Sequence, residues 1–235
     1  MAVQRLSLTQ IRANILEILG YSTSANAPWS LDSTLDLRIN QYGQRLPMRL
    51  NSMARQLNLP TPVRLDCWRT TADSSNSTTA AIQVAIGSAT VYMPVDLDAA
   101  ISYYDLDNKR PIYPLEGAYR YEIEDLVNSP PGLPKYIEVG GYVTEGSNWR
   151  RQATIYPAPI STYTYSLRLE YWRLPTSMPG EDPNYEYPDI DPKYESLFVF
   201  GPVTDLTRST GQEFDRYAAI EKEMLVEMLS TARAI

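Results

Sequence analysis

The sequence predicts an α+β fold: a helical frame of two N-terminal and two C-terminal helices with an inserted antiparallel β module. Apolar residues recur at helical spacing near both ends of the 235-residue chain, whereas residues 162–172 alternate with period two. Helices that flank a β-rich segment are typical of this class. We expect residues 1–62 and 188–235 to form the helical frame. Residues 63–187 are expected to form the β-rich insertion, which ends in a Pro-rich acidic connector.

The first helix is predicted to begin at Ser7 and to end at Gly20. Ser7 and Gln10 have the spacing of a capping box, in which each side chain satisfies a backbone N–H of the other residue. Leu8, Ile11, Ile15 and Ile18 then recur at helical spacing, and Gly20 stands where a C-terminal glycine cap is common.

A second helix is predicted over residues 35–57. Seven apolar residues form one stripe along it: Leu35, Ile39, Tyr42, Leu46, Leu50, Met53 and Leu57. The ring of Pro47 would press on the carbonyl of Gly43, so we expect a kink here or a split into two helices. Arg38, Arg45 and Arg49 lie along one flank of the stripe and are candidates for a subunit interface.

The middle of the chain has the composition of strands and loops. Residues 70–80 are rich in Ser and Thr and predict a loop, and residues 81–95 predict a strand or hairpin that ends at Pro94. Residues 162–172 give the clearest strand pattern, and residues 136–143 and 153–156 are shorter strand candidates.

Two helices are predicted after the connector at residues 175–192. Asp191 and Pro192 have the order of an N-cap and a first helical residue, so a helix is expected over residues 192–208. A second helix is expected over residues 212–231. Glu221 falls within its apolar face and therefore needs a partner or water.

The composition excludes several kinds of chemistry. The chain has no histidine and one cysteine, Cys67, so a Ser-His-Asp triad, the usual zinc sites and an intrachain disulfide are impossible. No signal peptide or membrane-spanning run is visible, which predicts a protein of a reducing compartment without a membrane segment. We expect no enzymatic activity, no cofactor and no metal.

The charge is unevenly distributed along the chain. The net charge is −7, but residues 1–70 carry eight arginines against four acids, a net charge of +4. Residues 71–235 carry a net charge of −11. The acidic remainder argues against tight binding to duplex DNA, because neutralisation of phosphates supplies most of such affinity.

One acidic cluster requires a choice between two interpretations. Asp189 and Asp191 form a D-x-D pair near Glu181 and Asp182, and such oxygens could hold Ca²⁺ or Mg²⁺. The cluster lacks the glycine and the distal glutamate of an EF-hand loop. A solvated linker with one capping aspartate is the favoured interpretation.

Several segments resemble one family. They are residues 133–141 (LPKYIEVGG), residues 153–159 (ATIYPAP), the strand from Tyr163 to Pro175, and residues 188–194 before the paired helices. Together with the two N-terminal helices, they are similar to the head-to-tail adaptor (connector, or head completion) proteins of tailed bacteriophages, in the tail-tube-A-like group of short-tailed phages. The Ser/Thr-rich segment at residues 73–79 departs from that pattern.

The resemblance implies a structural protein of the virion, located at the head-tail junction and assembled in the cytoplasm of the bacterial host. Members form a homo-oligomeric ring, usually of twelve copies, under the portal protein, give the tail or nozzle protein a docking platform, and extend a channel through which double-stranded DNA passes. No catalytic residue is carried over. The C-terminal region is expected to face the portal, with Met224, Met228, Arg233 and Ile235 as candidates. The β module is expected to face the tail, with Trp149, Tyr163 and Tyr165 as candidates.

Two other functions remain open from the sequence. The β module could be a tail-associated module that binds carbohydrate or a receptor through aromatic residues such as Tyr163 and Trp172. Alternatively, the acidic segment from Glu181 to Asp191 could form the centre of a metal-dependent hydrolase.

Overall fold

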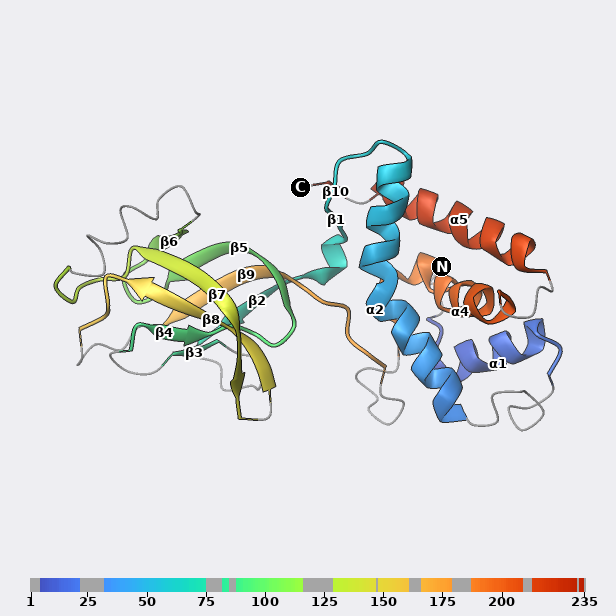
Figure 1. Cartoon of the computed structure of the whole chain (residues 1–235), viewed down its shortest axis with the longest axis horizontal. Coiled ribbons are helices and arrows are strands. Elements are labelled where there is room, and N and C mark those ends of the chain that lie inside the picture. The colour runs from blue at the N-terminus through green and yellow to red at the C-terminus, as the bar shows by residue number, and fades with distance from the viewer. Residues whose placement is uncertain are drawn as a thin grey trace. The chain divides into compact units, whose positions relative to one another are not determined.

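The computed structural model describes residues 5–21, 32–74, 82–84, 88–115, 129–146, 148–160, 166–178, 187–208, 213–231 and 233–234. The chain forms two compact units, residues 1–68 with 175–235 and residues 69–174. Within the described residues, the first unit contains four α-helices and the second an eight-stranded sheet (Figure 1). The predicted α+β class, a β module inserted in a helical frame, is confirmed.

The boundaries between the two units fall after Trp68 and after Leu174. The Pro-rich connector at residues 175–192 therefore belongs to the helical unit and not to the sheet unit. The indole of Trp68 donates to the carbonyl of Asp189 at 2.8 Å. Asn40 also forms two hydrogen bonds with the backbone of Met178, one through each polar atom of its amide. These hydrogen bonds hold the segments next to both boundaries, at Trp68 and at Met178, within the helical unit. The boundaries expected at residues 62 and 188 rest on local composition, which does not reveal such long-range bonds.

Helix α1 spans Leu8–Ile18, and both of its predicted ends are confirmed. The Ser7 hydroxyl accepts from the Gln10 N–H while the Gln10 side chain accepts from the Ser7 N–H, which is the complete capping box. At the other end Gly20 has φ = +77°, with Gly20 N–H bonded to Glu17 and Tyr21 N–H bonded to Leu16. This is a Schellman motif, whose left-handed residue favours glycine.

Helix α2 spans Asp32–Gln56 as one element with Pro47 inside it, so the predicted split does not occur. Figure 1 shows that the helix changes direction partway along its length, as expected where a proline removes one backbone bond. The predicted apolar stripe is buried from Leu35 to Leu50, and Ala54 continues it. Leu57 lies beyond the end of the helix and is exposed, because the chain turns there.

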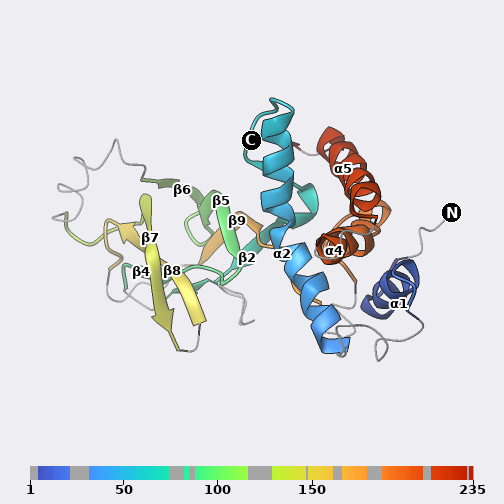
Figure 2. The same cartoon turned by 45° about the vertical axis from the view of Figure 1, so that its right-hand side comes forward.

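The first C-terminal helix begins later than predicted. Asp191 accepts from Lys193 N–H and Pro192 takes the first position, as expected, but they form only the 3₁₀ turn Pro192–Tyr194. Helix α4 then spans Leu197–Thr207, and α5 spans Phe214–Thr231. Nine of the eleven α4 residues are buried. Such a helix belongs in the centre of a unit, and Figure 2 shows α4 between α1, α2 and α5.

The described strands of the sheet unit follow one another along the chain, and the longest connection, between β6 and β7, spans residues 115–135. They are β2 (Arg69–Asp73), β3 (Gln83–Val84), β4 (Thr90–Tyr92), β5 (Leu97–Asp105), β6 (Arg110–Pro114), β7 (Tyr136–Glu145), β8 (Asn148–Tyr156) and β9 (Leu167–Arg173). Their order in the sheet is β2-β9-β5-β6-β7-β8-β4-β3. All pairings are antiparallel except β6 with β7. A short pair, β1 (Val63–Arg64) with β10 (Arg233–Ala234), belongs to the helical unit.

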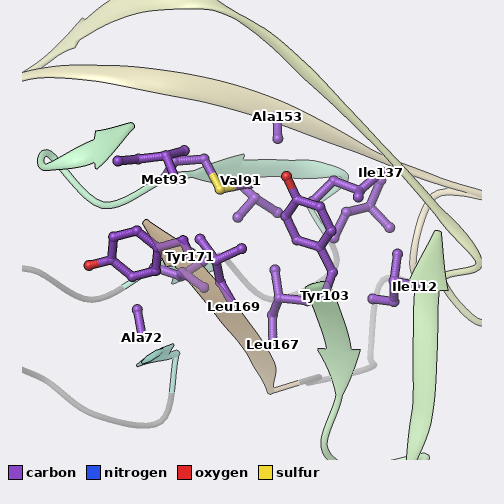
Figure 3. Close-up of a cluster of buried hydrophobic side chains, with 13 residues drawn as sticks. Ala72, Val91, Met93, Tyr103, Ile112, Ile137, Ala153, Leu167, Leu169 and Tyr171 are labelled. Atoms are coloured by element: carbon purple, nitrogen blue, oxygen red, sulfur yellow. The ribbon is translucent and has the colours of Figure 1, made fainter. Parts of the chain in front are cut away.

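One buried cluster fills the concave side of this sheet. Residues from the two ends of the strand order, such as Ala72 of β2 and Ile82 beside β3, belong to the same cluster, so the sheet curls around it. Figure 3 shows Tyr103, Leu167 and Ile137 converging from three different strands. Within β9, Leu167, Leu169 and Tyr171 are buried, which confirms the period-two pattern for the described part of that strand.

Three predictions for the β module were incomplete or wrong. Residues 69–73, predicted in part as a loop, form strand β2 beside β9, while the loop prediction for residues 75–80 lies outside the described residues. Strand β5 was not predicted because two irregularities in its pairing break the alternation of side chains. Strand β6 was not predicted because it contains Pro111 and Pro114, which are unusual within sheets.

Candidate interaction surfaces

A polar cluster of buried and half-buried side chains joins α2, α4 and α5. Arg49 donates to both carboxylate oxygens of Asp205 at 2.7 and 2.6 Å and to Glu221 at 2.5 Å. The Tyr42 hydroxyl donates to Glu221 at 3.0 Å, and the Arg49 guanidinium lies 4.7 Å from the Tyr42 ring centroid. The prediction that Glu221 needs a partner is confirmed, because both Arg49 and Tyr42 donate to its carboxylate. Burial, and then the negative charge of Glu221, raise the pKa of Tyr42 well above its ordinary value.

The three arginines of the predicted interface differ in their contacts within the chain. Arg49 is engaged within its own chain by Asp205 and Glu221. Arg38 and Arg45 are exposed, and neither makes an ion pair with any residue that the structure describes. Of the three, only Arg38 and Arg45 therefore present exposed guanidinium groups, while Arg49 bridges α2 to α4 and α5 within its own chain.

The α2 outer face lies opposite the buried stripe of the helix and is both apolar and basic. Leu37 is 55% exposed and Met48 is 72% exposed. Arg38, Arg45 and Arg55 are exposed on the same side. We use the name "α2 outer face" for Leu37, Arg38, Arg45, Met48 and Arg55. A surface of this composition is typical of a protein interface, where Met and Arg are enriched.

The α5 outer face has the opposite charge. Five exposed residues define it: Asp215, Ala219, Glu223, Val226 and Glu227. None of its three acids makes an ion pair within the described ranges. Tyr217, Leu225 and Met228 occupy the other side of the helix and are buried against the rest of the helical unit.

The C-terminal residues predicted to face the portal differ in accessibility. Met228 is buried in the helical unit, and Met224 is half-buried with its sulfur 3.8 Å from the Ser196 hydroxyl. Arg233 lies in β10, whose backbone pairs with Val63 and Arg64. Ile235 lies outside the described residues. Met228 thus packs inside the helical unit, whereas Met224 keeps part of its side chain accessible.

An exposed aromatic arm extends from the sheet unit. We use the name "β7–β8 arm" for residues 142–145 and 148–151, which pair with each other, whereas β4 pairs with β8 only at residues 152–154. Trp149 is 66% exposed and Tyr142 is 53% exposed. The register places Tyr142 opposite Arg151, and the Arg151 guanidinium lies 5.3 Å from the Tyr142 ring centroid.

Of the aromatic residues predicted to face the tail, Trp149 therefore lies on this exposed arm. Tyr163 and Tyr165 lie outside the described residues. Trp172, considered for carbohydrate binding, is buried and cannot present its ring to a ligand. Tyr142 was not predicted as a tail-facing residue. It lies in the predicted strand at residues 136–143, whereas Trp149 lies outside the predicted strand at residues 153–156, so only strand β8 as the structure has it brings the two onto one arm.

The acidic segment has a structural role where it is described. The Asp189 carboxylate accepts from Thr176 N–H at 3.1 Å, and the Asp191 carboxylate caps the 3₁₀ turn through Lys193 N–H. Glu181 and Asp182 lie outside the described residues. In the part of the chain that the structure describes, no three acidic, Cys or His side chains gather in a way that could hold a metal ion.

Comparisons with known proteins give no assignment. No protein-family model matches the chain, and no curated protein matches it. Within the described ranges, no helix is both long and apolar enough to span a membrane.

Proposed function

We propose that this protein is a structural component of a phage virion that forms a ring between the portal and the tail. The ring would extend the DNA channel and give the tail protein a docking platform, a role that needs no catalytic group. The proposal starts from the sequence resemblance to head-to-tail adaptors. The observation that carries it is the α2 outer face, on which Leu37 and Met48 are exposed beside Arg38 and Arg45, neither of which forms an ion pair with the residues that the structure describes.

The reasoning from this face to a ring is physical. Two large apolar side chains on this helix remain 55% and 72% exposed in the isolated subunit, and burying the exposed part of each would contribute about 1–2 kcal/mol. A protein that functions as a multi-copy assembly has such surfaces on its isolated subunits. The net charge of −7 also suits a channel through which DNA must slide without binding.

Electron microscopy of the purified chain mixed with the portal ring from the same genome tests the proposal. We expect additional ring-shaped density on the narrow end of the portal, from which the copy number can be counted. Bare portals beside free chains, over a range of salt and protein concentrations, would refute the adaptor role.

The β7–β8 arm is proposed as the contact to the tail. Trp, Tyr and Arg dominate the residues that contribute most to protein interfaces, and Trp149, Tyr142 and Arg151 combine all three on one arm. Replacing Trp149 and Tyr142 with Ala should leave the ring on the portal intact and abolish docking of the tail protein. Tyr113→Ala, at another exposed aromatic residue of the sheet unit, is the matched control.

The same arm supports the second candidate, a tail-associated module that binds carbohydrate or a receptor. Exposed aromatic rings can stack on the apolar faces of sugars, and Trp149 and Tyr142 are available for this contact. Glycan-array binding by the wild-type chain, lost in the Trp149→Ala variant, would favour this function. Absence of glycan binding together with tail docking would favour the adaptor.

A further inference from the structure

We propose that the α2 outer face of one copy packs antiparallel against the α5 outer face of the next copy. This inference rests on the proposed ring, and it names the two surfaces that meet. The occupant of the α2 outer face is then a second copy of the same chain, and each copy uses two different faces.

Charge is the first argument for this pairing. The α2 outer face carries Arg38, Arg45 and Arg55, whereas the α5 outer face carries Asp215, Glu223 and Glu227. Within the described residues, neither set is neutralised by ion pairs in its own chain. Complementary charges on two faces of one molecule favour association of copies and disfavour pairing of either face with itself.

The arrangement of these charges around each helix sets the direction of packing. At about 100° per residue, Leu37 and Met48 lie within about 20° of each other, and Arg38 and Arg45 lie about 60–100° to one side of them. On α5, Ala219 and Val226 form the apolar centre, and Glu223 and Glu227 lie on the same angular side. In both helices the charged residues lie on the side reached by rotating in the same sense from the apolar centre. Because both helices are right-handed, these two charged sides contact each other only when the helices run antiparallel.

The register follows from the sizes of the central side chains. Placing the long Met48 opposite the small Ala219 fills the space between the helices. In an antiparallel pair that alignment brings Arg45 opposite Glu223 at nearly the same height. Arg38 with Glu227 is offset by about 2 residues, or about 3 Å along the axis, and Arg55 with Asp215 by about 3 residues, or about 4.5 Å. Both offsets are within the reach of arginine side chains.

The same register avoids repulsion between like charges. Lys222 and Arg216 are the exposed basic residues of α5. Lys222 is level with Arg45 along the axis but lies on the opposite flank of the pair, and Arg216 is level with Asn51. The α2 arginine nearest to Arg216 on the same flank is Arg49, which Asp205 and Glu221 of its own chain already neutralise.

A contact between different faces propagates from copy to copy. Since α2 and α5 both pack against α4 with their buried sides, their outer faces point away from the shared core and cannot satisfy one another within one copy. Such a heterologous contact produces a ring when the rotation between copies closes. An isologous contact, in which α2 meets α2, would bring arginines together.

Disulfide trapping tests the contact directly. In a chain with Cys67→Ser, which removes the exposed native thiol, Met48→Cys together with Ala219→Cys should give a ladder of cross-linked species beyond the dimer. Met48→Cys together with Ala13→Cys, at an exposed position of α1, is the matched control and should give no ladder. Dimers from Met48→Cys alone would overturn the proposal, because they would show that α2 meets α2.

Charge exchange provides an independent test. One variant carries Arg38→Glu and Arg45→Glu, and the other carries Glu223→Arg and Glu227→Arg. Each alone should need at least about tenfold more protein to assemble, because attraction becomes repulsion at every junction. An equimolar mixture should recover assembly, since each junction of an alternating ring is again complementary. Glu17→Arg on α1 is the control for charge reversal. Normal assembly of both single variants, or no recovery in the mixture, would overturn the proposal.

Failure of this inference differs from failure of the proposed function. Rings on the portal without a cross-linked ladder would contradict the named contact and leave the adaptor role intact. A cross-linked ladder at high protein concentration without density on the portal would support the contact and refute the adaptor role.

Discussion

Gly201 lies where α4 makes its closest approach to α2, and replacing it with alanine is the sharpest test of this packing. A Cβ atom at Gly201 would lie 2.0 Å from two carbons of the Tyr42 ring, about 1.5 Å inside normal contact. The ring has little room to move, because its hydroxyl donates to Glu221 and Arg49 lies over its face.

Two opposing effects set the magnitude. Alanine is favoured over glycine within a helix by about 0.5–1 kcal/mol, whereas overpacking of a core costs about 1–3 kcal/mol and occasionally more. With an overlap as large as that at Gly201, the second effect should dominate. We expect Gly201→Ala to lower the free energy of unfolding of the helical unit by about 2 kcal/mol.

Urea unfolding followed by helix circular dichroism measures this loss. Gly43→Ala is a graded comparison, because its Cβ would lie 2.7 Å from the edge of the Phe198 ring, and it should cost less. Gly141→Ala is the matched control in the sheet unit, since nothing lies within 4 Å of the added atom. A Gly201→Ala variant as stable as the wild type would refute the described packing of α4 against Tyr42.

Three further predictions concern stability. Arg49→Ala leaves Glu221 buried with only the Tyr42 hydroxyl as partner, so urea unfolding should show a loss of about 2 kcal/mol, and an unchanged midpoint would contradict the role of this cluster. Ser7→Ala removes the capping box of α1 and should cost about 1 kcal/mol by thermal unfolding, with Thr9→Ala, at an exposed position of the same helix, as its control. Burial raises the pKa of Tyr103 to about 12; because its pKa in the unfolded chain is about 10, its contribution is complete below pH 10 and is lost as the pH rises toward 12. Urea unfolding at pH 11 should therefore show a loss of about 1.4 kcal/mol that Tyr103→Phe removes, and equal losses in both proteins would contradict the burial of this hydroxyl.

Much of the helical unit could be predicted because its signals are local. The capping box at Ser7 and the glycine cap at Gly20 involve residues within one turn of the helix end. The need of Glu221 for a partner was also readable, since a carboxylate within an apolar stripe must be compensated. Which groups would compensate it, Arg49 and Tyr42 from more than 170 residues away, was not readable.

The sheet was predicted less completely because strand pairing joins distant segments. Strand β2 lies beside β9, almost 100 residues further along the chain, and that pairing turns a Ser/Thr-rich stretch into a strand. In β5, two irregularities in the pairing shift the alternation. Such irregularities depend on the neighbouring strand and leave little trace in local periodicity.

Composition and neighbours within a few residues are enough to predict the fold class and the ends of α1 and to exclude histidine-based chemistry. The roles of the three arginines of α2, in contrast, depend on how the helices pack. Arg38, Arg45 and Arg49 lie within about 40° of one another around the helix, so their spacing does not distinguish them. The packing of α4 and α5 brings Asp205 and Glu221 to Arg49 and leaves Arg38 and Arg45 exposed.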